Sequence, residues 1–164
     1  MLEIERKFLV RGDGWRRDVR RSARMRQAFL GGDGVSVRVR ITGERARLNI
    51  KERRLGIERE EFDYPLPLDE AERLFALAGG GRIDKTRHYV PAGELTWEID
   101  EFDGDNAGLV VAEIELPSRE ASIERPPWLG EEVTDDERYY NVALALRPWR
   151  EWRPGRAGGE GGET

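Results

Sequence analysis

Residues 1–10 read MLEIERKFLV, and charged and apolar side chains alternate along this stretch. Successive side chains of an extended chain point to opposite faces, so Glu3, Glu5 and Lys7 share one face of a strand and the apolar residues share the other. Arg6 is the exception, on the apolar side. Carboxylates and an ammonium this close together suit a divalent cation and a polyanion, because the cation offsets the repulsion between the acids. The same pattern also fits an edge strand whose charged face is solvated.

The composition limits the classes of function. A chain of 164 residues favours one domain, and its net charge of −5 argues against general nucleic-acid binding. The chain has no cysteine, which excludes a thiolate zinc site, and its single histidine, His88, excludes a histidine-rich metal cluster. A metal must therefore be held by oxygen, which suits Mg²⁺ or Mn²⁺. His88 alternates with Arg87, so we expect a packed or surface histidine and no catalytic role.

No apolar run is long enough for a transmembrane helix, and no signal-peptide pattern precedes the first strand. We therefore expect a cytoplasmic protein with no membrane partner.

The alternation of the first stretch recurs along the chain. A Gly-containing turn at 42–44 joins two alternating runs, which predicts a hairpin. Pro65 and Pro67 are expected to end the strand that carries Phe62 and Tyr64. Helices are expected at 69–78 and 135–146, and the Gly- and Glu-rich tail beyond Arg156 is expected to be disordered. The other expected strands are Met25–Leu30, Val35–Ile41, Arg45–Lys51, Arg82–Val90, Leu95–Phe102 and Leu109–Leu116.

The signs of the charges are segregated by strand. Acids lie on 1–10, 95–102 and 109–116, whereas bases lie on 35–41, 45–51 and 82–90. Surface charges of soluble proteins are usually interspersed, and buried arrays of like charge are costly unless something matches them. The pattern therefore favours a closed antiparallel barrel with the charged faces inward and helices covering the apolar faces. A sandwich with the charges turned to solvent is the alternative.

A channel with one acidic and one basic wall suits a metal-bound polyphosphate. Arginines and lysines bind phosphate oxygens, and carboxylates hold the metal that bridges those oxygens. Hydrolysis then needs a water in line with the terminal phosphorus and little covalent chemistry from the protein.

Several motifs together resemble the CYTH, or triphosphate tunnel metalloenzyme, superfamily. Glu-x-Glu-x-Lys at 3–7 begins the series, which covers roughly residues 1 to 150 and is most similar to compact bacterial members. The further motifs, in the family's order, are Arg38-x-Arg40, LNIK ending in Lys51, Glu61-Phe62-Asp63 after Arg59, Lys85-Thr86-Arg87, Glu98-Ile99-Asp100, Glu113-Ile114-Glu115 and EEVTDDERYYN at 131–141.

The resemblance implies a mainly β (α+β) fold, a closed eight-stranded antiparallel β-barrel with a charged lumen and a few helices outside. It also implies Mg²⁺ or Mn²⁺ and a small-molecule polyphosphate substrate. Lys7, Glu5 and Lys85 are the implied catalytic residues, with Lys7 near the attacking water or the terminal phosphate. The implied metal ligands are Glu3, Glu5, Asp100, Glu113 and Glu115; the implied phosphate ligands are Arg38, Arg40, Lys51, Arg59, Lys85, Arg87 and Arg138; further lumen candidates are Glu61, Asp63 and Glu98.

The sequence departs from compact relatives at a few positions. Phe29 stands where tyrosine is common, and Glu137 and Tyr140 stand where lysines are frequent, which weakens the basic lid that the resemblance implies. The leading hypothesis is a metal-dependent triphosphatase that converts tripolyphosphate to pyrophosphate and phosphate. A class IV-type adenylate cyclase, a nucleoside or thiamine triphosphatase, and a polyphosphate- or nucleotide-binding module without turnover are the alternatives.

The end of the chain is expected to form a separate element. Two tryptophans lie within Trp149–Arg153, which predicts a short helix docked on one mouth of the tunnel. We assign residues 1–150 to the tunnel domain and 151–164 to a partly disordered extension. The apolar outer face leaves monomer and homodimer both open.

Overall fold

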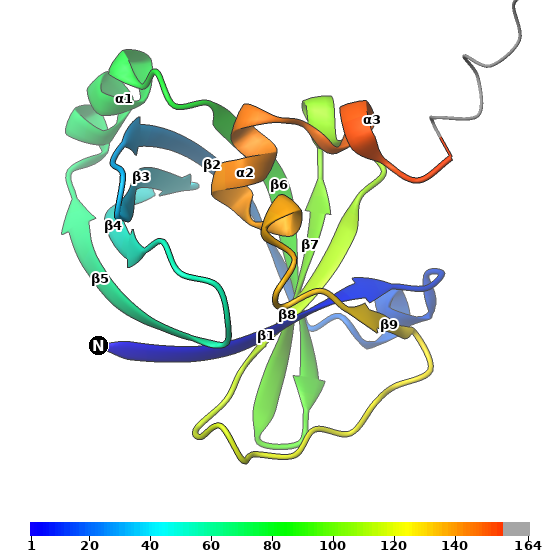
Figure 1. The fold of residues 1–164 in the computed structure, drawn as a ribbon. Coiled ribbons are helices and arrows are strands. Elements are labelled where there is room, and N and C mark those ends of the chain that lie inside the picture. Colours follow the sequence, from blue (N-terminus) through cyan, green and yellow to red (C-terminus); the bar gives the residue numbers. More distant parts are fainter. Residues whose placement is uncertain (156–164) are drawn as a thin grey trace, which may run out of the picture.

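Eight antiparallel strands close into a barrel in the computed structural model, which describes residues 1–155 (Figure 1). Around the barrel the strands follow the order β1-β5-β4-β3-β2-β6-β7-β8, and β8 pairs again with β1. The predicted closed eight-stranded antiparallel barrel is therefore confirmed. The barrel strands are β1 (Leu2–Val10), β2 (Arg21–Gly31), β3 (Val35–Thr42), β4 (Arg45–Glu52), β5 (Glu58–Leu66), β6 (Arg82–Ala92), β7 (Leu95–Phe102) and β8 (Val110–Glu115).

One edge of β1 pairs with two different strands along its length. Its N-terminal half pairs with β5, where Leu2 lies opposite Glu60, and its C-terminal half pairs with a ninth strand, β9 (Leu129–Glu132). The sequence did not predict β9, because Leu-Gly-Glu-Glu has no alternating pattern. Since β9 leads directly into the segment 133–146, this pairing brings that segment back to the barrel, where residues 141–146 contact β6 (Figure 1).

Three further boundaries differ from the expectation. β2 begins at Arg21, well before the expected Met25, because β6 pairs with its polar first residues. Pro65 lies inside β5, where it faces Arg47 of β4 and where β5 has no second neighbour to require an N–H donor. The helix expected at 135–146 is divided by the extended backbone of Tyr140 into a 3₁₀ turn and a short α-helix.

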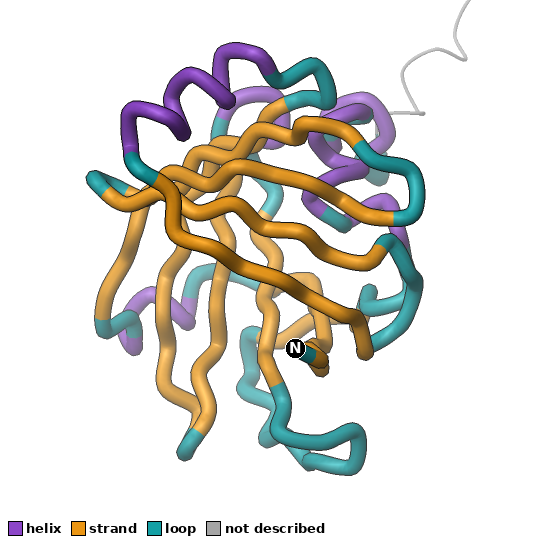
Figure 2. The backbone as a smooth tube through the Cα atoms, turned by 90° about the vertical axis from the view of Figure 1, so that its left-hand side faces the viewer, coloured by secondary structure: helices purple, strands orange, loops and turns teal. Residues whose placement is uncertain are grey.

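Helices cover parts of the barrel that would otherwise expose apolar surface (Figure 2). α1 packs against the outer face of β3 and β4, and another apolar cluster, which includes Phe8, Trp15 and Trp97, covers the outer face of β1, β7 and β8. The helices in the described part of the chain are α1 (Leu68–Leu77), α2 (Asn141–Leu146), α3 (Trp149–Trp152) and the 3₁₀ helices at Gly14–Asp18, Gly104–Asn106 and Glu137–Tyr139.

One end of the barrel interior is apolar. Phe29 lies opposite Arg38 and Phe102 lies opposite Lys85, so these rings share the face that carries the charges. They pack with Leu144 of α2 in one buried cluster. Since this cluster fills the barrel at that end, the charged part of the lumen is closed on one side.

The two C-terminal helices fit closely onto the barrel. Gly81 has a φ of +92°, and a side chain there would meet the carbonyl oxygen of Ala145 at 2.5 Å, so glycine allows α2 to approach β6. The backbone N–H of Trp149 donates to Asn106 Oδ1 at 2.8 Å. The predicted C-terminal helix therefore forms and packs on the 3₁₀ helix at 104–106.

The proposed boundary between residues 150 and 151 falls within α3 and stays a prediction. The tail that was expected to be disordered, from Arg156 onward, lies outside the described residues. Within residues 1–155, every helix is too short or too polar to cross a membrane.

Candidate active site

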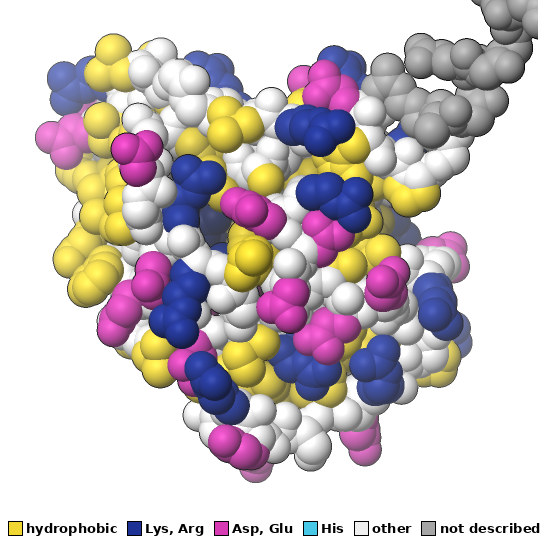
Figure 3. Space-filling model, in the orientation of Figure 1, with side chains coloured by type: hydrophobic (Ala, Val, Ile, Leu, Met, Phe, Trp, Pro, Cys, Tyr) yellow, Lys and Arg dark blue, Asp and Glu magenta, His cyan; other side chains and the backbone are white. Residues whose placement is uncertain are grey.

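The charged strand faces line a cavity of about 330 Å³ inside the barrel. On the face shown in Figure 3 the molecule is hollowed near its centre, and Lys and Arg atoms are recessed in the hollow. The predicted site residues that line the cavity are Glu3, Glu5, Lys7, Arg38, Arg40, Lys51, Arg59, Glu61, Lys85, Arg87, Glu98, Glu113 and Glu115. The fold therefore brings together residues that lie more than a hundred positions apart in the sequence.

The acidic wall is built by three neighbouring strands, β7, β8 and β1. Glu5 lies opposite Glu115, and Glu113 lies opposite both Glu98 and Lys7. Burial, and then the charge of Glu113, raise the pKa of Glu5 from 4.5 to about 7. Burial also raises the pKa of Glu98 and of Glu115. The carboxylates on this wall thus repel one another, and an added cation would relieve the repulsion.

The basic wall is built mainly by β3, β4 and β6. Burial and the neighbouring Arg40 guanidinium lower the pKa of Arg38 to about 10. The Nε atoms of Arg38 and Arg40 are buried without a hydrogen-bond partner in the described structure. Unpartnered guanidinium nitrogens beside one another fit an anion with several oxygen acceptors.

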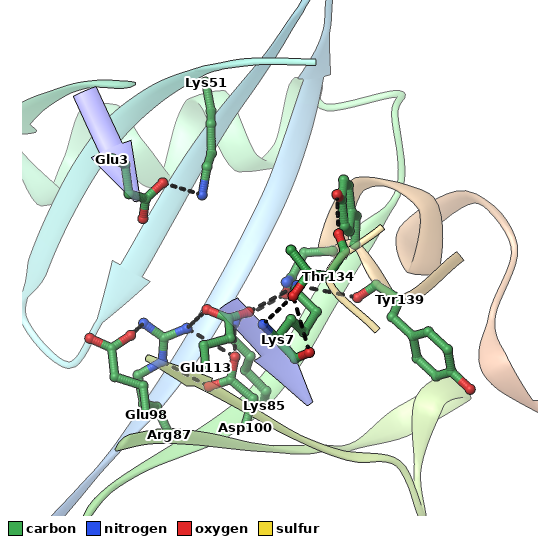
Figure 4. Close-up of polar contacts among 12 residues, drawn as sticks. Glu3, Lys7, Lys51, Lys85, Arg87, Glu98, Asp100, Glu113, Thr134 and Tyr139 are labelled. Atoms are coloured by element: carbon green, nitrogen blue, oxygen red, sulfur yellow. Dashed lines mark hydrogen bonds and ion pairs between the residues drawn. The ribbon is translucent and has the colours of Figure 1, made fainter. Parts of the chain in front are cut away.

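Ion pairs join acidic and basic side chains inside the lumen (Figure 4). Lys51 Nζ lies 2.5 Å from Glu3 Oε2, and both side chains are largely buried. Lys7 Nζ lies 2.9 Å from Glu113 Oε1, and Arg87 Nη2 lies 3.5 Å from Glu113 Oε2. Burial raises the pKa of Glu113, but Lys7 and Arg87 outweigh it and hold this pKa well below 4.5.

Asp100 does not join the acidic wall, contrary to the sequence-based expectation. Its side chain is fully buried behind the basic residues, where it accepts from Lys85 Nζ at 2.7 Å and from Arg87 Nε and Nη2 at 2.7 and 2.9 Å. Lys85 Nζ also donates to Asn141 Oδ1 at 3.0 Å. Burial lowers the pKa of Lys85 to about 7, although Asp100 opposes this effect. Asp100 therefore orients two cations and is not placed to hold a metal in the cavity.

Two other predicted residues also lie outside the cavity lining. Asp63 pairs with Arg47 at 2.5 Å at the rim of the barrel. Arg138 pairs with Asp136 at 2.6 Å, and its guanidinium lies 4.6 Å from the centre of the Trp152 ring. The structure thus gives Arg138 a packing contact on the outside, where the sequence motif had implied a phosphate ligand.

A divalent metal fits the donors that are present, although they are not preassembled. Within residues 1–155, no three acidic or histidine side chains already converge as a metal site. Glu5, however, is a partly buried carboxylate that makes no ion pair in this part of the chain, and carboxylate oxygens are the ligands that Mg²⁺ and Mn²⁺ prefer. The observation that supports a metal here is therefore that the partly buried Glu5 carboxylate is repelled by neighbouring carboxylates, Glu113 first among them.

Some residues at or beside the cavity were not predicted from the sequence to be ligands. Asn49 alternates with the bases of β4 and donates to Oε1 of the cavity-lining Glu61 at 2.7 Å, so the period-two pattern already contained its signal. Tyr140 lines the cavity with its ring 4.3 Å from the Arg59 guanidinium carbon, and only the path of 133–146 places it there. Gln27 is fully buried, and its amide atoms have no hydrogen-bond partner in the described structure.

His88 lies on the outer side of β6, as its alternation with Arg87 predicts. Its Nδ1 is 2.7 Å from Ser22 Oγ, and its Nε2 is 3.1 Å from Glu101 Oε1. The ring also packs against Trp15 at 5.0 Å between centroids. These contacts hold a packed histidine away from the cavity.

Comparison with known proteins places the barrel among related sequences and structures. A sequence model described as the CYTH domain matches residues 1–142. The chain is 40% identical over 150 residues to the inorganic triphosphatase of Acetivibrio thermocellus, covering 90% of this chain and 96% of the relative. It is 38% identical over 154 residues to the inorganic triphosphatase of Nitrosomonas europaea, covering 89% of this chain and 98% of the relative. The crystal structure of the inorganic triphosphatase NE1496 superposes with a TM-score of 0.64 at 34% identity, covering 88% of this chain and 94% of that one.

Proposed function

The chain belongs to the CYTH domain family, and from this membership we propose that it is a metal-dependent triphosphatase that hydrolyses inorganic tripolyphosphate to pyrophosphate and phosphate. The observation that carries the proposal is the pairing of an acidic and a basic wall inside one cavity of about 330 Å³. A triphosphate is the kind of ligand that needs both walls, because its oxygens accept from cationic side chains and also bind a metal.

The acidic wall is the proposed metal side. Glu5, Glu113 and Glu115 would hold the divalent cation together with Glu3, and Mg²⁺ or Mn²⁺ suits these oxygen donors equally. When bound, the cation would neutralise negative charge on the phosphate oxygens while water displaces the leaving group.

The basic wall is the proposed phosphate side. Arg38 and Arg40 donate to phosphate oxygens, and Asp100 keeps Lys85 and Arg87 oriented toward the same space. The remaining phosphate ligands on this side are Lys51 and Arg59. Positioning of the chain by fixed cations accounts for most of what a protein must do in phosphoryl transfer.

Lys7 is proposed to act at the terminal phosphate or at the attacking water. Its ammonium is buried, lies 2.9 Å from Glu113 and 5.2 Å from the centre of the Tyr140 ring. The apolar cluster around Phe29 and Phe102 closes one end of the lumen, which limits the entry of bulk water from that side. Attack of one water on the terminal phosphorus then breaks the outer anhydride bond and releases phosphate and pyrophosphate.

Product analysis tests the proposal. The purified chain is incubated with tripolyphosphate or ATP, each with Mg²⁺, Mn²⁺ or chelator. Metal-dependent release of phosphate, faster from tripolyphosphate, is the expected result. Pyrophosphate and cyclic AMP from ATP would instead assign a cyclase, and tight binding without any product would assign a binding module.

The variant Glu113→Gln provides a more direct test of the acidic wall. Glutamine keeps the shape of this cavity-lining side chain but replaces the charged carboxylate with a neutral amide, which binds a metal ion more weakly. The turnover rate is therefore expected to fall by a factor of about 10² or more. Retained activity at ordinary metal concentrations would remove Glu113 from the metal site. The cytoplasmic location and the choice between monomer and homodimer remain predictions from the sequence.

A further inference from the structure

Acidic and basic side chains of the tunnel neutralise one another in ion pairs. Lys51 on β4 lies 2.5 Å from Glu3 on β1, although the proposed function gives Lys51 to phosphate and Glu3 to metal. Lys7 and Glu113 make the same kind of pair at 2.9 Å. Both side chains of each pair are largely buried, so water screens the attraction between their charges only weakly.

We propose that the Lys51–Glu3 ion pair is a competitive lock that couples the binding of the divalent cation to the binding of the polyphosphate. A cation that binds Glu3 must displace the Lys51 ammonium, and a phosphate that binds Lys51 must displace the Glu3 carboxylate. Whichever of the cation and the polyphosphate binds first therefore breaks the ion pair. The one that binds second then finds the side chain that it needs, Glu3 or Lys51, already released. This inference rests on the proposed function, because it takes the occupants of the two walls from it.

The coupling must act in both directions. Thermodynamic linkage requires that the cation improves polyphosphate binding by the same factor by which polyphosphate improves cation binding. Because an added anion sits in contact with the cation, direct attraction also contributes to this factor. The lock is therefore tested with each ligand alone, where the direct attraction is absent.

Other residues of the same lumen provide matched controls. Arg40 lines the same cavity as Lys51 but makes no ion pair within residues 1–155. Glu115 lines the cavity beside Glu5 and likewise has no ion pair in the described part of the chain. Neutralising Arg40 or Glu115 changes the field of the tunnel by one charge without releasing a partner.

The first experiment measures Mn²⁺ binding to the polyphosphate-free protein by isothermal titration calorimetry. Lys51→Met is expected to bind Mn²⁺ about 10-fold more tightly than the wild type, since Glu3 is no longer occupied, whereas Arg40→Met gains about 3-fold or less. Circular dichroism confirms that each variant is folded. Equal gains in the two variants, or no gain in Lys51→Met, would overturn the lock.

The second experiment measures tripolyphosphate binding in EDTA, where no turnover occurs. Glu3→Gln is expected to bind about 10-fold more tightly than the wild type because Lys51 is free, whereas Glu115→Gln gains about 3-fold or less. Success in only one of the two experiments would also overturn the inference, because a shared ion pair must affect both ligands. Metal-dependent turnover by the wild type tests the proposed function separately, so a catalytically active protein without these shifts loses the lock and keeps the function.

Discussion

Replacing Glu5 with glutamine is expected to stabilise the metal-free protein while it removes a proposed metal ligand. Burial and Glu113 raise the pKa of Glu5 from 4.5 to about 7 in the folded state. At 1.36 kcal/mol per pKa unit, the ionised carboxylate therefore destabilises the fold by about 3 kcal/mol. Because the folded-state pKa is the higher one, no stability is lost below pH 4.5, and stability falls as the pH rises through 7.

The assay is urea unfolding in EDTA at pH 5 and at pH 8. Glu5→Gln carries no ionisable group, so its advantage over the wild type should be small at pH 5 and reach about 3 kcal/mol at pH 8. Glu94→Gln, an exposed substitution in the turn between β6 and β7, is the control and should show no such difference. Adding Mn²⁺ should stabilise the wild type but not Glu5→Gln, because only a folded site binds the metal.

The reasoning would be refuted if Glu5→Gln were no more stable than the wild type at pH 8, or if its advantage were the same at both pH values. Either result would mean that the Glu5 carboxylate is already neutralised in EDTA. A gain in stability on loss of a functional group is the behaviour expected of an active site that is held under electrostatic strain.

Three further substitutions test the supporting contacts. Asp100→Asn removes the buried carboxylate that pairs with Lys85 and one of the carboxylates that pair with Arg87, so urea unfolding should show a loss of about 3 kcal/mol or more, with a reduced kcat/KM for tripolyphosphate. Trp149→Ala removes a partly buried ring of α3 and should cost about 2 kcal/mol in thermal unfolding, while KM stays unchanged because this ring does not line the cavity. Tyr140→Phe loses the hydroxyl that donates to the Thr134 carbonyl oxygen at 2.6 Å, so it should cost about 1 kcal/mol and leave turnover nearly unchanged.

The alternation of residues could be interpreted from the sequence because it is a local property. Glu3, Glu5 and Lys7 fall on one face of any extended chain, and the turn at Gly43 predicts the hairpin of β3 and β4 without further information. Segregation of the signs by strand likewise predicted an acidic and a basic wall. The order of strands in the barrel makes the acidic wall continuous, since β7, β8 and β1 are neighbours, whereas β2 separates β6 from the other two basic strands.

The sequence did not determine what each charge faces. Asp100 and Glu98 alternate on the same face of β7, yet Asp100 is enclosed by Lys85 and Arg87, whereas Glu98 reaches the cavity. Their depth depends on the apolar cluster that fills one end of the barrel, and this cluster is assembled from strands and helices distant in the sequence. The position of Arg138 depends on a related feature, because the turn at 137–139 directs its side chain toward Trp152.

The sequence by itself therefore determined the eight strands of the barrel, their charged faces and the chemistry of the ligand that those faces suit. The tertiary structure alone decided which acid meets which base in the lumen, including Glu3 with Lys51, because closure of the barrel between β1 and β5 leaves only β5 between β1 and β4. It also decided that Glu5 makes no ion pair within residues 1–155, although Lys7 and Lys51 lie near enough to influence its charge. Burial and long-range pairing set these electrostatic relations, and a period of two residues carries no information about either.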